Sequence, residues 1–100
     1  MVLSSVTINE QVLEELCRRN SVHKLSVFGS FARGEVRPDS DIDLIVEFSE
    51  PKGLFALVEL ESQLSDLFGR KVDLLTEQSV SPYIRNSIRR DLRVLFEAAR

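Results

Sequence analysis

The sequence predicts an α/β fold in which a mixed sheet of three to four strands is covered by about four helices. Short apolar runs at residues 24–28, 41–48 and 71–76 have the length and composition of strands. The longer segments around them repeat apolar residues every three or four positions, as amphipathic helices do. A helix between the second and third runs would join two parallel strands by a right-handed crossover.

The first helix is expected near the start of the chain. Thr7 and Glu10 have the spacing of a capping box, which places the helix start at Thr7, and the pattern ends near Asn20. The run at 24–28 then forms the first strand. Four apolar residues should lie along the inner side of this helix: Val12, Leu13, Leu16 and Cys17.

The second half of the chain contains the clearest helical pattern, from Leu54 to Phe68, and Gly69 should end that helix. Pro82 is well placed to open a last helix. The segment 93–96 either completes that last helix or forms a short edge strand. The apolar residues expected to face inward are Leu54, Leu57, Val58, Leu60, Leu64, Leu67 and Phe68 in one helix and Ile84, Ile88 and Leu92 in the other.

Length and composition fit one compact domain over residues 1–100. A chain of 100 residues, 43% hydrophobic and 29% charged, can bury roughly two thirds of its unfolded surface in a single core. Its net charge of −3 argues against strong direct binding of nucleic acid, which depends on many Lys and Arg contacts to phosphate. The sequence has no signal-peptide pattern and no apolar run near the ~20 residues needed to span a bilayer, so we expect a cytoplasmic protein without membrane contact.

The motif with most chemical content joins Gly29-Ser30 to Asp41-Ile42-Asp43. A glycine after a strand permits close approach of phosphates, and the short helix that can begin at Ser30 would direct free amide groups at an anion. Asp41 and Asp43 share one side of an extended strand because side chains alternate with period two. Two adjacent carboxylates repel each other unless a cation compensates, and Mg²⁺ favours carboxylate and phosphate oxygens.

Each half of this motif also has an ordinary structural interpretation. A Gly-Ser pair after a strand is a common turn. The two aspartates could be a polar turn at Pro38 to Asp41 followed by an exposed strand residue. Only the combination of both halves favours a metal-assisted reaction on a nucleotide.

The combination resembles the DNA polymerase β-like nucleotidyltransferase superfamily. Its signature is an apolar residue, Gly, then Gly or Ser, a spacer, and acidic-apolar-acidic, which Phe28-Gly29-Ser30 and Asp41-Ile42-Asp43 match. The fuller pattern, Gly-Ser-x-Ala-Arg-Gly followed by Ser-Asp-x-Asp-Leu, is similar to the minimal nucleotidyltransferases. Many of these are antitoxins paired with a HEPN-domain toxin.

The resemblance implies further site residues. A third carboxylate on a later strand completes the metal site of the superfamily, and Asp73, flanked by Val72 and two leucines, is the candidate. Arg33 stands where the family has an arginine, so a phosphate contact is implied; a solvated loop arginine is the alternative. Asp41, Asp43 and Asp73 would then be catalytic and metal-binding, with two Mg²⁺ or Mn²⁺ ions. Gly29, Ser30 and Arg33 would bind ATP.

The family also implies the acceptor. The resemblance implies transfer of AMP to a hydroxyl, a tyrosine, of the cognate HEPN ribonuclease toxin. We expect this acceptor to supply its own docking, since no added domain to hold a nucleic acid is evident in the sequence. A non-catalytic antitoxin that neutralises the toxin by binding alone is the alternative, and a small-molecule transferase is a third possibility. The sequence does not specify the base, the metal preference or the stoichiometry.

Two questions about surface residues stay open at this level. Phe55 and Tyr83 fall outside the apolar stripes of their helices, so each either packs in the core or contacts a partner. Arg89, Arg90 and Arg93 form a basic side on the last helix. That side is either a solvated face or a contact for phosphates or an acidic partner.

Overall fold

The computed structural model describes residues 2–3, 6–35, 37 and 39–99. Its strands are β1 (Val2–Leu3), β2 (Val6–Thr7), β3 (Val22–Phe28), β4 (Ile42–Phe48), β5 (Val72–Thr76) and β6 (Arg93–Glu97). Its helices are α1 (Glu10–Arg19), α2 (Ser30–Arg33), α3 (Leu54–Phe68), α4 (Pro82–Asp91) and the 3₁₀ helix η1 (Glu77–Ser79).

Four strands form a mixed sheet in the order β5-β4-β3-β6. β3 pairs antiparallel with β4 and β6, whereas β4 and β5 are parallel and are joined through α3. The predicted α/β class and the parallel pair are therefore confirmed. The segment after α4 is the edge strand β6, which decides between the two alternatives for it. The antiparallel pair of β1 and β2 was not predicted.

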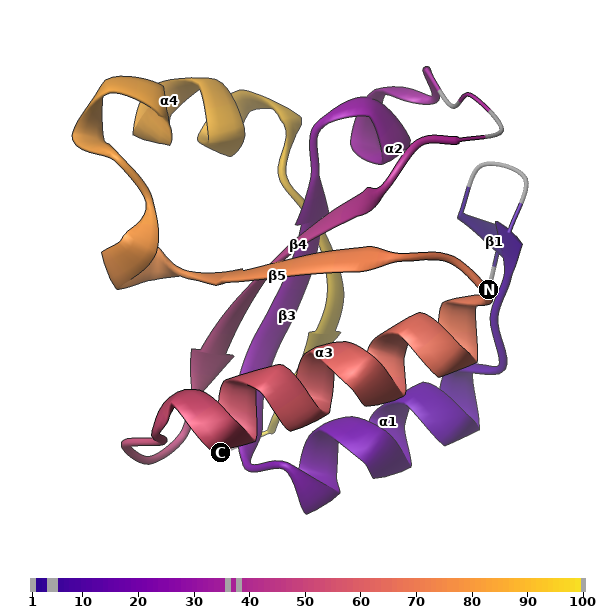
Figure 1. Cartoon of the computed structure of the whole chain (residues 1–100), viewed down its shortest axis with the longest axis vertical. Coiled ribbons are helices and arrows are strands. Elements are labelled where there is room, and N and C mark those ends of the chain that lie inside the picture. Colours follow the sequence, from indigo (N-terminus) through magenta and orange to yellow (C-terminus); the bar gives the residue numbers. More distant parts are fainter. Residues whose placement is uncertain (1, 4–5, 36, 38, 100) are drawn as a thin grey trace.

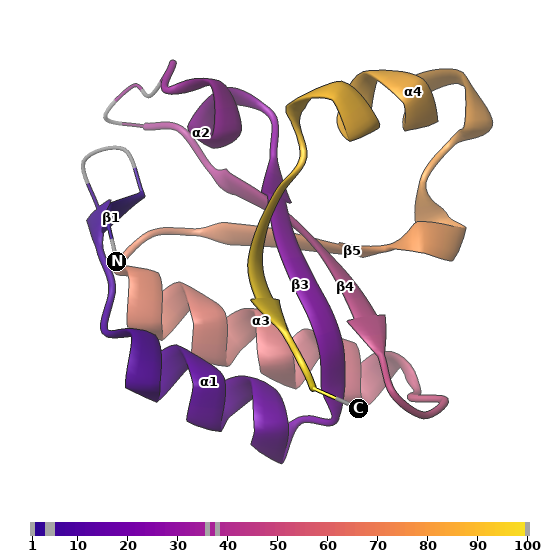
Figure 2. The same cartoon turned by 180° about the vertical axis from the view of Figure 1, so that it is seen from behind.

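Helices α1 and α3 lie side by side on one face of the sheet (Figure 1). A hydrogen bond of 2.9 Å from Asn20 to Gln63 links their neighbourhoods. The alternate residues Ile42, Leu44 and Val46 of β4 point into the core beneath these helices and are fully buried. Seen from behind, β6 runs alongside β3 (Figure 2). Helices α2 and α4 lie at the end of these strands that is farther from α1 and α3.

The predicted start of α1 is wrong by two residues. Asn9, not Thr7, caps the helix, and its Oδ1 accepts hydrogen bonds from the backbone N–H groups of Gln11 and Val12 at 3.0 and 3.2 Å. Thr7 instead pairs with Val2 in the small two-stranded sheet. Because Thr7 belongs to β2, the helix starts later and Asn9 is its N-cap.

The inner sides of the helices are narrower than predicted. In α3 the buried residues are Leu60, Leu64 and Phe68, and none lies in its first turn. Leu54 is 75% exposed because the first turns of α3 extend past the buried core. Four residues predicted to face inward are exposed: Val12, Leu54, Val58 and Ile84. In α4 only Ile88 is buried.

The single cysteine is part of the core, as predicted. Cys17 is fully buried on α1, and burial, followed by the nearby Glu14, raises the pKa of its thiol to about 12. The thiolate is therefore scarce at neutral pH, and Cys17 has no place in the chemistry. Among the described residues, no helix has the length and apolar character needed to cross a membrane.

Candidate active site

The candidate site lies on the face of the sheet that points away from α1 and α3, here called the open face. Asp43, Ile45 and Glu47 of β4 belong to it, because they alternate with the buried Ile42, Leu44 and Val46. Asp43 pairs with Asp73 in the parallel register of β4 and β5. The two carboxylates therefore stand on neighbouring strands and the same face, as the sequence predicted.

Gly29 brings the phosphate-loop candidate against this pair. Its backbone has φ 73° and ψ −149°, a conformation reserved in practice for glycine. A Cβ at this position would stand 2.7 Å from Oδ2 of Asp43, so the missing side chain is also what lets the carboxylate approach. The turn leads into α2, whose first residue is Ser30, as predicted.

Asp41 lies one residue before β4 begins, where the prediction had it inside the strand. Its Oδ2 stands 3.6 Å from Nζ of Lys71, the residue preceding β5. The backbone N–H of Ile42 bonds to the carbonyl of Lys71 at 3.0 Å, which aligns the two strand starts. The structure thus places Asp41 at the same end of the sheet as Asp43 and Asp73, paired with a lysine.

The electrostatics of Asp43 are those of a crowded carboxylate. Burial, the charge of Asp73 and then that of Asp41 raise the pKa of Asp43, while Arg33 acts in the opposite direction. Each cause except Arg33 disfavours the charged form. A cation bound beside Asp43 would reverse this balance, because it stabilises the carboxylates that now repel one another.

The donor chemistry suits a hard divalent cation, but the three carboxylates are not gathered around one point. Across residues 2–3, 6–35, 37 and 39–99, no three His, Cys, Asp or Glu side chains stand close enough to hold a metal ion. Asp43 and Asp73 are matched in register, whereas Asp41 is paired with Lys71. A ligand set of all three therefore requires Asp41 to exchange Lys71 for the metal.

Arg33, the predicted phosphate contact, is already engaged. Its Nη1 donates to Oδ2 of Asp91 at 2.8 Å, and its Nε donates to Oε2 of Glu35 at 3.2 Å. These two hydrogen bonds, the one to Asp91 first, raise the pKa of Arg33. The bond to Asp91 ties α2 to the end of α4, so a phosphate contact would have to compete with this pair.

Sequence reasoning missed the residues that hold Asp73 in place. β5 is an edge strand, and two of its backbone N–H groups donate to side chains of α3. Oε2 of Glu61 accepts from the N–H of Leu74 at 2.9 Å, and Oγ of Ser65 accepts from the N–H of Val72 at 3.1 Å. Because these residues flank Asp73, α3 fixes the strand that carries the third carboxylate. The sequence does not single out these two residues, because α3 also carries Glu59, Ser62, Gln63 and Asp66.

Arg70 similarly holds the segment before β4. Its Nη1 donates to the carbonyls of Arg37 and Ser40 at 3.0 and 3.3 Å. Its guanidinium also lies 5.3 Å from the ring centre of Phe31 in α2, within the range of a cation–π contact. Ser40 accepts from the N–H of Arg37 in the predicted polar turn, although Pro38 lies outside the described residues.

Exposure decides the question about the two aromatic residues. Phe55 on α3 is 93% exposed and Tyr83 on α4 is 95% exposed, so neither packs in the core. Phe55 lies in the first turn of α3, which covers the opposite face of the sheet, whereas Tyr83 lies in the first turn of α4, near the open face. Both side chains are therefore available for contact with a partner.

The fold and the site define a nucleotidyltransferase. Residues 9–95 match the family described as the nucleotidyltransferase domain, and this chain belongs to that family. Within it, the protein adenylyltransferase MntA of Thermococcus cleftensis is 39% identical over 79 residues, covering 79% of this chain and 80% of that protein. The chain is thus a minimal nucleotidyltransferase related to MntA, which confirms the resemblance seen in the sequence.

Solved structures show the same fold. A crystal structure of a toxin–antitoxin with AMP-PNP superimposes with a TM-score of 0.74 at 26% identity, covering 91% of this chain and 75% of that one. A structure of an MNT antitoxin with a tri-AMPylated HEPN toxin of Shewanella oneidensis matches with a TM-score of 0.65 at 23% identity, covering 89% and 70%. At this identity, the second match shows only that the fold is shared.

Proposed function

We propose that this protein transfers AMP from ATP to a hydroxyl group, a tyrosine, of a HEPN-domain ribonuclease toxin and thereby acts as its antitoxin. The observation that carries the proposal is the pairing of Asp43 with Asp73 on the open face, with Gly29 against Asp43. The relationship to the protein adenylyltransferase MntA supports the reaction. The structural match to a toxin–antitoxin with AMP-PNP supports both the nucleotide and the type of partner.

The residues divide between phosphate and metal binding. Gly29 and Ser30 would bind the β- and γ-phosphates through backbone amides and the Ser30 hydroxyl. Two Mg²⁺ or Mn²⁺ ions held by Asp41, Asp43 and Asp73 would neutralise the triphosphate and stabilise the entering and leaving oxygens. Arg33 would add a phosphate contact in place of its bond to Asp91.

The transfer itself needs no covalent intermediate on the protein. The acceptor hydroxyl oxygen attacks the α-phosphorus in line with the bond to the β-phosphate. As the new phosphorus–oxygen bond forms, the old one breaks, and pyrophosphate leaves with the electron pair. The hydroxyl proton passes to solvent. The role of this chain is therefore to align the triphosphate and the acceptor and to balance charge.

The test is AMP transfer to the co-expressed toxin, followed by intact mass and by pyrophosphate release. We expect a gain of one or more AMP masses on the toxin with the wild-type chain. Asp43→Asn and Asp41→Asn should lower the rate by at least about 100-fold, because each removes a charge from the metal site. Asp66→Asn is the matched control, since Asp66 is an exposed residue of α3 on the other side of the sheet.

The same experiment separates catalysis from binding alone. A toxin silenced by the chain without any gain in mass would support the non-catalytic antitoxin and contradict the transfer reaction. Full transfer by both aspartate variants would contradict the assigned site. A toxin bearing AMP on a tyrosine, located by peptide mass spectrometry, would support both the reaction and the class of acceptor.

A further inference from the structure

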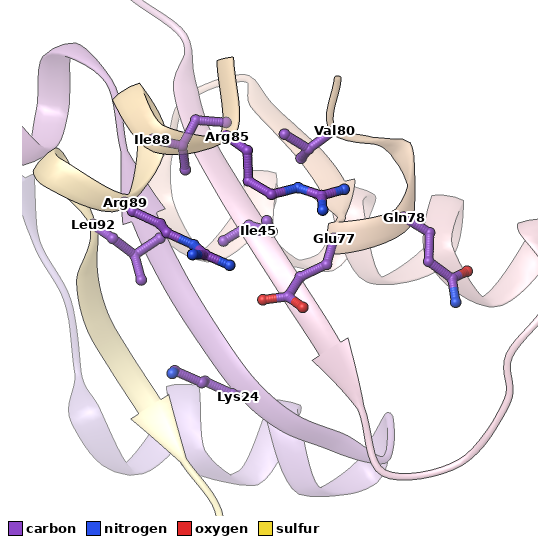
Figure 3. Close-up of a pocket in the computed structure, with 9 residues that line it drawn as sticks. All are labelled: Lys24, Ile45, Glu77, Gln78, Val80, Arg85, Ile88, Arg89 and Leu92. Carbon is purple, nitrogen blue, oxygen red and sulfur yellow. The ribbon is translucent and has the colours of Figure 1, made fainter. Parts of the chain in front are cut away.

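We propose that the cavity between α4, η1 and the open face of the sheet is the nucleoside pocket of this enzyme, holding the base and ribose of the donor nucleotide. The cavity has a volume of about 370 Å³ (Figure 3). This size falls within the range of small-molecule sites. The proposal rests on the proposed function, since it concerns the part of the donor that lies beyond the phosphates.

The position of the cavity follows from the register of β4. Phe28, which precedes Gly29, pairs with Asp43, and Ser26 pairs with Ile45. Asp43 and Ile45 share the open face, and two residues of strand advance by roughly 6.8 Å. Ile45 lines the cavity. Along β4 from Asp43 toward Ile45, the glycine turn and the carboxylates therefore come first and the cavity follows. A nucleotide whose triphosphate lies at the turn and the carboxylates would extend its nucleoside toward the cavity.

The lining combines apolar and polar groups in a way that suits a base and a ribose. Ile45 lies on the sheet side, and Val80, Ile88 and Leu92 supply further apolar surface. Figure 3 shows Arg85 and Arg89 reaching from α4 over this surface, with Glu77 of η1 opposite them. A planar guanidinium stacks on an aromatic base, and a carboxylate accepts hydrogen bonds from ribose hydroxyls.

The polar side chains of the lining are free to bind a ligand. Within the described ranges, no hydrogen bond or ion pair engages the side chains of Lys24, Glu77, Arg85 or Arg89. Arg33 differs, because it is held by Asp91 and Glu35. Two guanidinium groups, one ammonium group and one carboxylate thus line the cavity and are available to the base and the ribose.

The test compares ATP with inorganic tripolyphosphate, which has the phosphates but lacks the nucleoside. Binding of each to the full chain is measured by titration calorimetry in the presence of Mg²⁺. Arg89→Ala and Glu77→Ala should weaken ATP binding by about tenfold and change tripolyphosphate binding by less than about twofold. Ser30→Ala should weaken both ligands.

Arg90→Ala is the matched control, because Arg90 neighbours Arg89 on α4 but does not line the cavity. It should leave both affinities unchanged. Circular dichroism melting of each variant verifies folding, and the two lining variants, on different elements, keep the test decisive if one of them fails to fold.

Two outcomes would overturn the proposal. Unchanged ATP affinity in both lining variants would exclude the cavity as the nucleoside site. Equal losses of ATP and tripolyphosphate would assign the lining residues to the phosphates. None of these results depends on AMP transfer, so failure of the pocket and failure of the proposed reaction remain distinguishable.

Discussion

The two faces of β4 divide the work of the molecule. On one face, Ile42, Leu44 and Val46 are buried beneath α1 and α3 and contribute to stability. On the other, Asp43 is crowded by Asp73 and Asp41, a situation that costs stability because like charges repel. Alternate residues of this seven-residue strand thus stabilise the fold or, in the case of Asp43, belong to the candidate site. The candidate site thus lies on the face of β4 that does not contribute to the hydrophobic core.

The largest effect on stability is expected on the helix-covered face. Leu44→Ala should lower the free energy of unfolding by about 2–5 kcal/mol, because Leu44 is fully buried and its truncation leaves a cavity. The adjacent Ile45→Ala, on the open face and only half-buried, should cost less than about 2 kcal/mol. Urea unfolding measures both. Equal losses would contradict the division between the two faces.

Gly29→Ala should affect activity more than stability. A Cβ would collide with Oδ2 of Asp43 and add backbone strain of about 1–3 kcal/mol. Displacing Asp43 should reduce AMP transfer by about 100-fold. Gly34→Ala is the control, because Gly34 also has a positive φ, 76°, but no atom of the described residues lies within 4 Å of the position that a Cβ would take there. Comparable activity in the two variants would show that the close approach of Gly29 to Asp43 is not needed for AMP transfer.

The smallest effect should be a gain in stability from Asp43→Asn. Because the folded pKa of Asp43 lies above its usual value, the folded state holds the proton more tightly, and Asp43 destabilises the fold as pH rises through that interval. Without divalent cations, the variant should therefore be more stable than wild type at pH 7 by up to about 1 kcal/mol.

Thermal unfolding at two pH values checks the sign of this effect. The difference between Asp43→Asn and wild type should disappear near about pH 3, where the carboxyl is protonated in both folded and unfolded chains. Mg²⁺ should stabilise wild type more than the variant. If the variant is less stable than wild type at pH 7 without metal, the charge of Asp43 does not destabilise the fold.

Much of the fold followed from local patterns. The helix from Leu54 to Phe68 and its end at Gly69 were predicted correctly, because helical periodicity and a left-handed glycine depend on neighbouring residues. The resemblance implied that Asp73 stands on a later strand beside Asp43, and the parallel register of β4 and β5 pairs these two residues. The start of α1 failed because two capping residues were available and only the pairing of β1 with β2 chose between them.

The sequence alone thus determined the α/β class, the face of β4 that carries Asp43 and the glycine turn beside it, since each depends on the spacing of nearby residues. Only the tertiary structure decided that Arg33 binds Asp91, that Glu61 and Ser65 brace the strand of Asp73, and that α4 encloses a cavity over Ile45. These contacts join residues far apart in the chain. Their existence depends on how the packed elements meet, which no local pattern specifies.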